Sequence, residues 1–575
     1  MDSKQTKILL IVFALVLSAW LISPLIFSRS EISQTFVIPT PAFDASRAYA
    51  TTEEFVKLYP KRDLGSLESR QSTGFLHDRL QELGYSITYA HFDARIARRK
   101  LVGRNVIGFR QGQTPDTLAL IAHFDTAPTT TQGATANGSG VGVLLELARV
   151  FAAVPMRRSL LIVFSDGGEY GSLGAKDFAE SYHGPNPIAA ALSLDHVAPG
   201  DLAALRLGAT GQMKGFAPPW LRQTAYQAAE AQGLPVYAPS IIREHYERAI
   251  LVSGADQGPL LSAGIPAINL GSLSTDRARQ RSTYHSPQDT IENLKVSSLG
   301  KFGFAAERIM RTLDALQSVP KESPDSLRLW DARYWMPETG TILHIFAFLP
   351  LAVVFWFNAK NHHGTLSAIG IRRELLVSFG TALPFWAFLV SISLVRALRL
   401  LPTYSLYPAT AKDPVLLNIP WSILGSILGT AFFVAVVCSL IGLFSVRSLP
   451  KPDFHASRVV LMGLLLGIAA LALAYNTYWA VVFLLLPAWV WGLASCGKTW
   501  SKRIRNGIWI IAAGIPFYAA TWIYCARLGL GWNFLWYLVL ALGSGLFTSS
   551  GYYLGIAGIT LGLRFLVIQF RRNES

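Results

Sequence analysis

Four side chains of metal-binding type stand out in the first half of the sequence. They are His123 in AHFDT, Glu169 in FSDGGEYGSLGA, Asp195 in LSLDHV and His285 in TYHSPQDT. Imidazole and carboxylate groups are common ligands of zinc and related divalent ions. Two such ions about 3.5–4 Å apart can activate a water molecule and polarise a carbonyl group. These residue types therefore indicate metal-assisted hydrolysis as the chemistry to consider.

The elements that must position these residues form an alternating pattern. Short apolar runs that end at turn residues cover 105–109, 118–124, 159–165, 190–196 and 266–271, and helical patterns cover 141–154 and 175–182. This alternation predicts an α/β domain with a mostly parallel sheet flanked by helices. Ligands bind beyond the carboxyl ends of the strands in such a sheet. His123, Glu169 and Asp195 lie at or just after strand ends, so we expect them to share one cleft.

Each of these residues also has a purely structural interpretation. Glu169 could cap the helix that follows it, and Asp195 could be a satisfied polar residue at a strand end. His285 could be a loop residue held by Asp289. Taken singly, these interpretations are favoured. As an ordered set the residues indicate descent from a metal site, although not present activity.

The motifs around these residues resemble a known family. AHFDT, GATANGSGVGVLLELARVF, FSDGGEYGSLGA, SLD, SGADQGPLLSAGIPAINL and YHSPQDT occur in this order. They resemble the signature blocks of the di-zinc aminopeptidases, metallopeptidase family twenty-eight, over about residues 45–315. The resemblance implies zinc, with His123 and Asp195 on one ion and Glu169 and His285 on the other. It also implies supporting roles for Asp125, Asp256 and Tyr284, with Asp125 orienting His123.

Two departures from the family pattern affect the chemistry directly. Ala136 stands where the family has a carboxylate that bridges both ions, and Gly168 stands where it has the glutamate that serves as general base. A methyl group cannot coordinate a metal, and the neighbouring Asn137 offers only a neutral amide. General acid–base catalysis is worth about 10² to 10⁴ in rate. We therefore predict no catalytic residue at position 168, and zinc as one ion or none.

Two nearby residues could in principle compensate for these losses. Asp166 precedes Gly168 by two residues, and His196 follows Asp195. Residues two apart along a strand share a face, so Asp166 is the better candidate for reaching the cleft. A single ion held by His123, Glu169, Asp195 and His285 is a further possibility. Its coordination shell would be closed, which suits a structural ion better than a catalytic one.

The rest of the chain indicates a membrane protein. Of its 575 residues 51% are hydrophobic, and the mean hydropathy is +0.34. An apolar run at 8–27 predicts an uncleaved signal anchor, and no further candidate appears before about residue 341. Later candidate spans are 341–358, 375–395, 415–444, 459–474, 478–495, 508–524, 532–547 and 552–569. We predict an anchor over residues 1–29, an aminopeptidase-like domain over 30–335 and an all-α polytopic membrane domain of about eight helices over 336–575.

Loop charges predict the orientation of these spans. The loops 359–373, 446–458 and 496–507 carry ten Lys and Arg against four in the alternating loops. The positive-inside rule makes these loops cytoplasmic and the peptidase-like domain extracytoplasmic, hence periplasmic in a bacterium and in a vacuolar or reticulum lumen in a eukaryote. Nine spans would place the C-terminus outside, whereas Arg571 and Arg572 favour the inside. The layout resembles that of the vacuolar membrane proteases and endoplasmic-reticulum metallopeptidases.

Charge and cysteine content exclude other classes. Residues 341–575 hold 17 Lys and Arg against four Asp and Glu, so 13 of the 15 net positive charges belong to the membrane part and indicate lipid contact, not nucleic acid. The three cysteines, Cys438, Cys496 and Cys525, lie in or beside predicted spans, so the α/β domain has no disulfide framework. Inside the spans Arg564 and His344 show no evident acidic partner.

Three functional hypotheses remain open from the sequence. The first is a pseudopeptidase that binds peptides or partner proteins at the extracytoplasmic cleft. The second is an active metallo-exopeptidase with an altered metal site. The third is a lipid-binding or transport module with the external domain as its receptor. Specificity is expected in the segment 197–250, with Trp220, Tyr226 and Tyr246 as apolar contacts.

Overall fold

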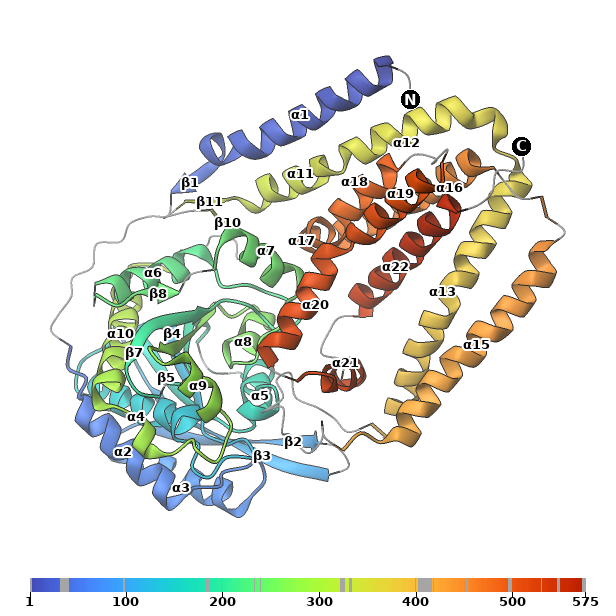
Figure 1. Cartoon of the computed structure of the whole chain (residues 1–575). Helices are drawn as coiled ribbons and strands as arrows, with labels where there is room; N and C mark the ends of the chain where they lie inside the picture. The colour runs from blue at the N-terminus through green and yellow to red at the C-terminus, as the bar shows by residue number, and fades with distance from the viewer. Residues whose placement is uncertain are drawn as a thin grey trace.

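The computed structural model of the chain describes most of its 575 residues. The description leaves out residues 1–2, 31–40, 97–98, 183, 185, 198, 232, 238, 321–325, 330–332, 399, 402–415, 417, 448, 451–452, 495–498, 529, 545–548 and 571–575. Cys496, Arg571 and Arg572 therefore lie outside the described residues. Figure 1 shows an α/β domain beside a bundle of long helices.

An eight-stranded sheet forms the centre of the α/β domain. Its strand order is β2-β3-β5-β4-β6-β9-β7-β8. The strands are β2 (Ser86–Ile96), β3 (Arg99–Arg110), β4 (Thr114–His123), β5 (Arg158–Ser165), β6 (Ile188–Leu194), β7 (Leu202–Gly208), β8 (Val236–Tyr237) and β9 (Ala267–Ser274). The four central strands are mutually parallel, whereas β2, β3 and β7 join antiparallel neighbours. The predicted fold class, a mostly parallel sheet flanked by helices, is confirmed.

Helices cover both faces of the sheet because its strands alternate. Along β4, Leu118, Leu120 and Ala122 belong to one core cluster, whereas Ala119 and Ile121 belong to another. The first cluster is covered by α2 (Ala45–Leu58), α3 (Leu67–Glu82), α4 (Ser139–Ala152), α6 (Pro219–Glu230) and α10 (Val296–Ala315). The second is covered by α5 (Leu173–Ser181) and α8 (Gln257–Ser262).

Two expected specificity residues lie in this core instead. Trp220 and Tyr226 are on α6, and each is less than 8% exposed. The expectation that they line the cleft is wrong, because both side chains pack in the main core cluster of the domain. Tyr246, on α7 (Ile241–Ala249), points to the helical region, where its hydroxyl donates to the Pro516 carbonyl at 3.3 Å.

Short strands connect the α/β domain with the membrane helices. After α1 (Ser3–Ile26), β1 (Ser28–Ser30) pairs with β11 (Arg333–Trp335), which also pairs with β10 (Leu327–Arg328). β11 leads directly into α11 (Pro337–Ala347) and α12 (Leu349–His362). The anchor and the start of the C-terminal helices are therefore held side by side, although they are about 300 residues apart in the chain.

The described helices supply six that are long and apolar enough to cross a membrane, or seven if a bent pair counts as one. The six are Ser3–Ile26, Pro337–His362, Ala368–Ala397, Trp421–Ile441, Phe454–Tyr475 and Ser550–Gln569, and the bent pair is Trp500–Ala512 with Ile515–Ile523. Two further predicted stretches lie on shorter apolar helices, Thr477–Leu493 and Asn533–Gly543. The apolar runs thus predicted where helices form better than how long each helix is.

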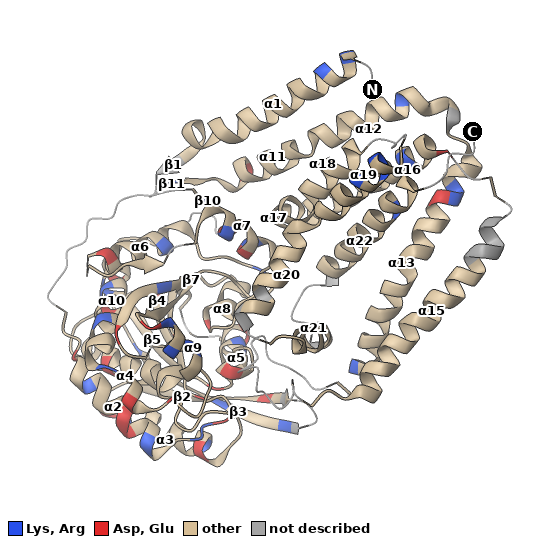
Figure 2. Ribbon diagram, viewed as in Figure 1, with Lys and Arg blue, Asp and Glu red and all other residues tan. Residues whose placement is uncertain are grey.

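Charge is distributed unevenly along the bundle. Figure 2 shows that Lys and Arg on the helices gather mainly at the end where both chain termini lie. The N- and C-terminal ends of the described chain lie at this same end (Figure 1). Positive charge is therefore concentrated at one end of the helical bundle.

One expectation about the membrane helices is wrong. Arg564, on α22 (Ser549–Gln569), forms an ion pair with Glu374, on α13 (Ala368–Ala397). The sequence reading placed position 374 at the boundary of a basic loop, whereas the helix begins at Ala368 and carries Glu374 into the bundle. An acidic partner inside the helical region therefore exists.

Candidate active site

Parallel pairing brings the ends of β4, β5 and β6 to one edge of the sheet. His123 is opposite Ser165 in the ladder, and Ile121 is opposite Ser193, two residues before Asp195. The loop after β5 carries Glu169, and the loop after α9 (Arg277–Thr283) carries His285. All four predicted metal-binding residues are described, and their side chains lie in two pairs.

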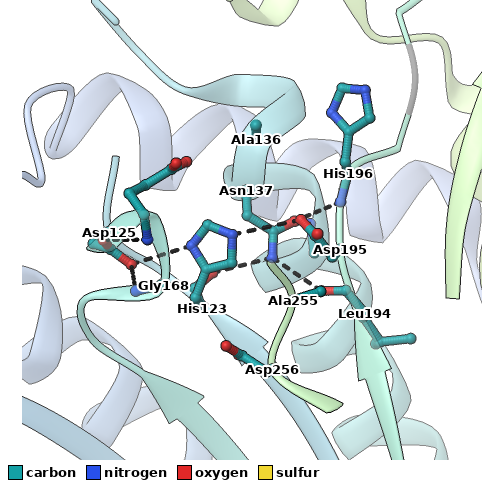
Figure 3. A network of polar contacts seen from close by, with 12 residues as sticks. His123, Asp125, Ala136, Asn137, Gly168, Leu194, Asp195, His196, Ala255 and Asp256 are labelled. Atoms are coloured by element: carbon teal, nitrogen blue, oxygen red, sulfur yellow. Dashed lines mark hydrogen bonds and ion pairs between the residues drawn. The ribbon is translucent and has the colours of Figure 1, made fainter. Parts of the chain in front are cut away.

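The first pair consists of His123 and Asp195 (Figure 3). The distance from His123 Nε2 to Asp195 Oδ1 is 3.5 Å, and His123 Nδ1 lies 3.1 Å from Asp125 Oδ1. Burial lowers the pKa of the His123 imidazole, but the hydrogen bonds with the two carboxylates outweigh this effect and raise it well above its usual value. The imidazole is therefore fixed between two negative groups.

Asp125 positions both the histidine and the loop beside it. Its Oδ1 accepts the backbone N–H of Gly168 at 2.7 Å, and its Oδ2 accepts that of Glu169 at 3.1 Å. Asp125 is completely buried. One carboxylate thus sets the distance between His123 at the end of β4 and Glu169 after β5.

The second pair consists of Glu169 and His285. Glu169 Oε2 lies 2.9 Å from His285 Nε2, and both side chains are less than 10% exposed. The geometry is not that of a hydrogen bond: Glu169 Oε1 and both nitrogens of His285 have no hydrogen-bond partner among the described residues. The ring of Tyr284 stacks on the imidazole with centroids 3.7 Å apart. Buried polar atoms that lie close together without hydrogen-bond partners are typical of a position that binds an ion or another ligand.

Ala136 and Asn137 lie beside the first pair, as Figure 3 shows. Ala136 is 1% exposed, and its methyl group offers no donor atom. Asn137 Nδ2 donates to the carbonyls of His123 and Leu194, while its Oδ1 accepts the N–H groups of Gly140 and His196. Four backbone partners therefore occupy the amide, and Asn137 stabilises the strand ends instead of replacing the missing carboxylate.

Gly168 is closed against His123. A Cβ atom at position 168 would lie 2.3 Å from Cγ of His123. No side chain fits there unless the imidazole moves. The position where the family resemblance implies a general base therefore carries no side chain, and the His123 ring fills the space that a side chain would need.

Asp166 does not face the metal-binding pairs. Its Oδ2 accepts from Ser69 Oγ at 3.3 Å and from the Arg104 N–H at 3.1 Å, and it lines a separate pocket of about 260 Å³ with these residues and Arg70, His91 and Val102. Burial, with the charge of Asp125, raises the pKa of Asp166 to about 8. β5 ends at Ser165, and Gly167 has a φ of 71°. Strand alternation therefore does not extend from Asp166 to Gly168. For this reason, the expectation that Asp166 shares a face with position 168 does not hold.

His196 is also directed elsewhere. Figure 3 shows its ring turned away from His123, although its backbone N–H joins the network around Asn137. The residue has a φ of 59°, and Nε2 lies 3.1 Å from Nε2 of Gln280. Burial lowers the pKa of this imidazole to about 4. His196 is thus a neutral neighbour of the first pair.

Asp256 and Asp289 complete the surroundings of the site. Asp256 Oδ2 accepts from Ser165 Oγ at 2.6 Å, which connects it to the end of β5. Asp289 accepts from Thr135 N and Oγ1, both at 2.7 Å, and from Ala136 N at 3.1 Å. The sequence analysis gave Asp289 only the role of holding His285. Asp289 also accepts hydrogen bonds from Thr135 and Ala136, which lie about 150 residues earlier in the chain. No short stretch of sequence could predict this contact.

The described residues include no group of three or more His, Cys, Asp or Glu side chains that could hold one ion. They supply two pairs, each with one histidine and one carboxylate. Their place beyond the strand ends of a mostly parallel sheet is where ligands bind in such folds, as the resemblance to the zinc aminopeptidases led us to expect.

Comparisons with known proteins point to the same family as the sequence motifs. Residues 105–310 match the model of Peptidase family M28. The vacuolar membrane protease of Schizosaccharomyces japonicus is 27% identical over 320 residues, which cover 55% of this chain and 33% of that protein. The BOS complex subunit NCLN of Canis lupus familiaris is 27% identical over 198 residues, covering 32% and 35%.

Among solved structures, a zinc aminopeptidase from Bacillus subtilis, BSAP, aligns with 15% identity and a TM-score of 0.41, covering 49% of this chain and all of that one. The chain spans about half or less of the length of the first curated relatives that it matches, from 33% to 48%. The apolar helices together with membrane-protein relatives make the chain a multi-pass membrane protein.

Proposed function

We propose that this protein is a membrane-anchored pseudopeptidase whose M28 domain binds peptides or partner proteins at its cleft without efficient hydrolysis. The observation that carries the proposal is the pair of losses at Ala136 and Gly168, seen in a domain that otherwise keeps its fold and its donor pairs. The residues of the site, and not the fold, determine activity, since one fold supports many activities.

The donor pairs fit metal ions in spacing but not in number. Two atoms that each lie about 2.0–2.1 Å from one ion are roughly 3–3.5 Å apart, since the angle between them is near tetrahedral. The 3.5 Å and 2.9 Å distances within the two pairs are of this size. A catalytic zinc ion needs about three protein ligands, and with Ala136 each pair supplies two. Zinc binding is therefore weakened, to one ion or none.

The missing base and the missing metal ligand would both affect the same step, the activation of a water molecule. A bound zinc ion would lower the pKa of a water molecule, and a carboxylate would then take its proton. Asp166 and His196 face away from the pairs, and position 168 has no room for a side chain. The two losses therefore combine instead of acting separately.

A protein or peptide ligand fits what remains of the cleft. Buried, unpaired atoms of Glu169 and His285 offer polar contacts, and Tyr284 adds a partly exposed aromatic ring. One relative is named as a subunit of a complex, which supports a protein partner. We further propose that the cleft is extracytoplasmic, because the basic loops and the charged end of the bundle lie on the opposite side from the domain (Figure 2).

An active exopeptidase with an altered site is the alternative. It is favoured by the spacing of the two pairs, which is that of shared ligands, and by a protease among the relatives. A single ion bound by one pair and water would retain some Lewis acidity.

The test compares the full-length protein in detergent with Ala136→Asp and with Ala136→Asp combined with Gly168→Glu. Elemental analysis measures bound zinc, and aminoacyl chromogenic substrates measure turnover. Ala136→Asp is expected to raise zinc toward two ions per chain by giving each pair a third ligand. Turnover is expected only in the double variant, and weakly, because the new glutamate must displace His123.

His285→Ala serves as the control, since it removes one pair and should lower any zinc content of the Ala136→Asp protein. If the unaltered protein holds two zinc ions and turns over like the double variant, the pseudopeptidase proposal is wrong and the exopeptidase alternative stands.

A further inference from the structure

A polar cluster lies inside the helical bundle, at the contact of α13, α16 (Phe454–Tyr475) and α22. Glu374 of α13 forms an ion pair with Arg564 of α22, and Ser457 Oγ of α16 donates to Glu374 Oε2 at 3.1 Å. All three residues are less than 5% exposed. Ionisable groups within membrane helices are costly and rare, and they commonly mark functional positions.

Two hydroxyl groups extend this cluster by one helical turn. Ser378 follows Glu374 by four residues and Thr560 precedes Arg564 by four, so each shares a helix face with its charged residue. Both are buried, and neither Ser378 Oγ nor Thr560 Oγ1 has a hydrogen-bond partner among the described residues. Hydroxyls in membrane helices usually donate to a carbonyl of their own helix, as Ser391 does to Ala387 at 2.7 Å. The hydroxyls of Ser378 and Thr560 do not form such a bond.

The unpaired atoms define the chemistry of a partner. Arg564 Nε is buried without a partner among the described residues, and it can only donate. The two hydroxyls can donate as well, while Arg564 and Ser457 engage the two oxygens of Glu374. All three unpaired groups can therefore donate to acceptor oxygens of a ligand.

Charge points the same way. Arg458 follows Ser457 on α16, is 9% exposed, and donates from Nη2 to the Gly492 carbonyl. No described carboxylate forms an ion pair with it. Together Arg458 and Arg564 outnumber Glu374, so this part of the bundle holds an excess positive charge that an anion would compensate.

We propose that the cluster around Glu374, Ser378, Thr560 and Arg564 binds a phosphate-type oxyanion, carried by an anionic phospholipid or free in solution. A guanidinium N–H and two hydroxyls offer the donors that phosphate oxygens accept. Glu374 lies in the second turn of α13, and Arg564 lies near the end of α22. Lys and Arg on the helices gather mainly at one end of the bundle (Figure 2), which would draw anions to that end. The membrane domain then has a binding role of its own, independent of the M28 cleft.

The test uses the full-length protein in nanodiscs of phosphatidylcholine with and without phosphatidylglycerol. Native mass spectrometry measures retained lipid, and thermal unfolding measures the effect of inorganic phosphate. The variant combines Ser378→Ala with Thr560→Val. Removing unpaired buried hydroxyls does not harm an unliganded fold, so the variant should stay folded. We expect it to retain about tenfold less phosphatidylglycerol, or to lose the stabilisation by phosphate.

Ser391→Ala is the matched control, because Ser391 is on the same helix and is as buried as Ser378, at 7% exposure each. It should bind as the unaltered protein does. Retention of phosphatidylglycerol identifies a lipid source, and stabilisation by phosphate alone identifies a free anion; both support the site. The proposal is overturned if neither probe binds the unaltered protein, or if the double variant binds both unchanged.

Discussion

At the scale of single residues, Gly168 lies in close contact with His123. The His123 ring packs against the glycine backbone, and a Cβ atom at position 168 would approach Cγ of that ring to 2.3 Å. Asp125 fixes both the ring and the Gly168 N–H. Asp125 therefore holds the His123 ring and the Gly168 backbone close to each other.

This close contact predicts that Gly168→Ala destabilises the protein by about 1–3 kcal/mol, the usual cost of overpacking. Thermal unfolding of the full-length protein measures the change. Gly74→Ala in α3 is the control, since nothing lies within 4 Å of its added Cβ and alanine favours a helix by up to about 1 kcal/mol. Equal effects of the two substitutions would show that His123 is not packed on Gly168.

At the scale of elements, long-range hydrogen bonds place the segment that enters α4. Asp289 lies in the loop before α10, yet it accepts three hydrogen bonds from Thr135 and Ala136. Because Asp289 is fully buried, these bonds are not exchanged with water. The position of Ala136 beside the first metal-binding pair therefore depends on a loop far along the chain.

Asp289→Ala is expected to lower the free energy of unfolding by about 3 kcal/mol, because it leaves buried N–H groups unpaired. Urea unfolding provides the measurement. Asp276→Ala is the comparison: Asp276 caps the exposed start of α9 through the Arg279 N–H, and its loss should cost about 1 kcal/mol. A smaller effect at Asp289 than at Asp276 would contradict the assigned role.

The fold could be predicted from the sequence further than the site could. Apolar runs ending at turn residues identified β3 to β6 and β9, since burial on both faces requires such runs. The directions of Asp166 and His196 could not be predicted, because both follow the last strand residue, where turn dihedral angles replace alternation. Glu374 could not be predicted as a partner of Arg564, because the neighbouring Arg372 and Arg373 made the start of its helix look like part of a basic loop.

At the scale of the whole molecule, α7 joins the α/β domain to the membrane helices. Glu244 is buried between Arg222 and Arg248, at 3.1 Å and 2.9 Å, and both arginines also donate to the Ser326 carbonyl ahead of β10. Asn476 Nδ2 of the helical region donates to the Arg248 carbonyl at 2.9 Å. This ion-pair network therefore links α7 to the segment before β10 and to the helical region.

The network predicts a pH dependence of stability. Burial raises the pKa of Glu244, but the charges of Arg222 and Arg248 outweigh burial and lower it below 4.5. A lowered pKa contributes stability that is fully present above the unfolded value and is lost as pH falls through the folded value. Glu244→Gln should cost roughly 3 kcal/mol at pH 7, and the difference from the unaltered protein should shrink below about pH 4.5.

Thermal unfolding between pH 7 and pH 3 measures this difference. Glu247→Gln on the same helix is the control, because Glu247 pairs with Arg243 at the surface and should matter by less than about 1 kcal/mol. A gap between Glu244→Gln and the unaltered protein that stays constant down to pH 3 would contradict the assignment.

The sequence by itself determined the class of fold and the membrane character, because periodicity and residue type are local properties. Only the tertiary structure decided that His123 pairs with Asp195 and Glu169 with His285, that His123 closes the space at Gly168, and that Arg564 has Glu374 as its partner. These outcomes depend on strand register, loop dihedral angles and helix packing. Such quantities are fixed by contacts between segments far apart in the chain, and no short stretch of sequence contains them.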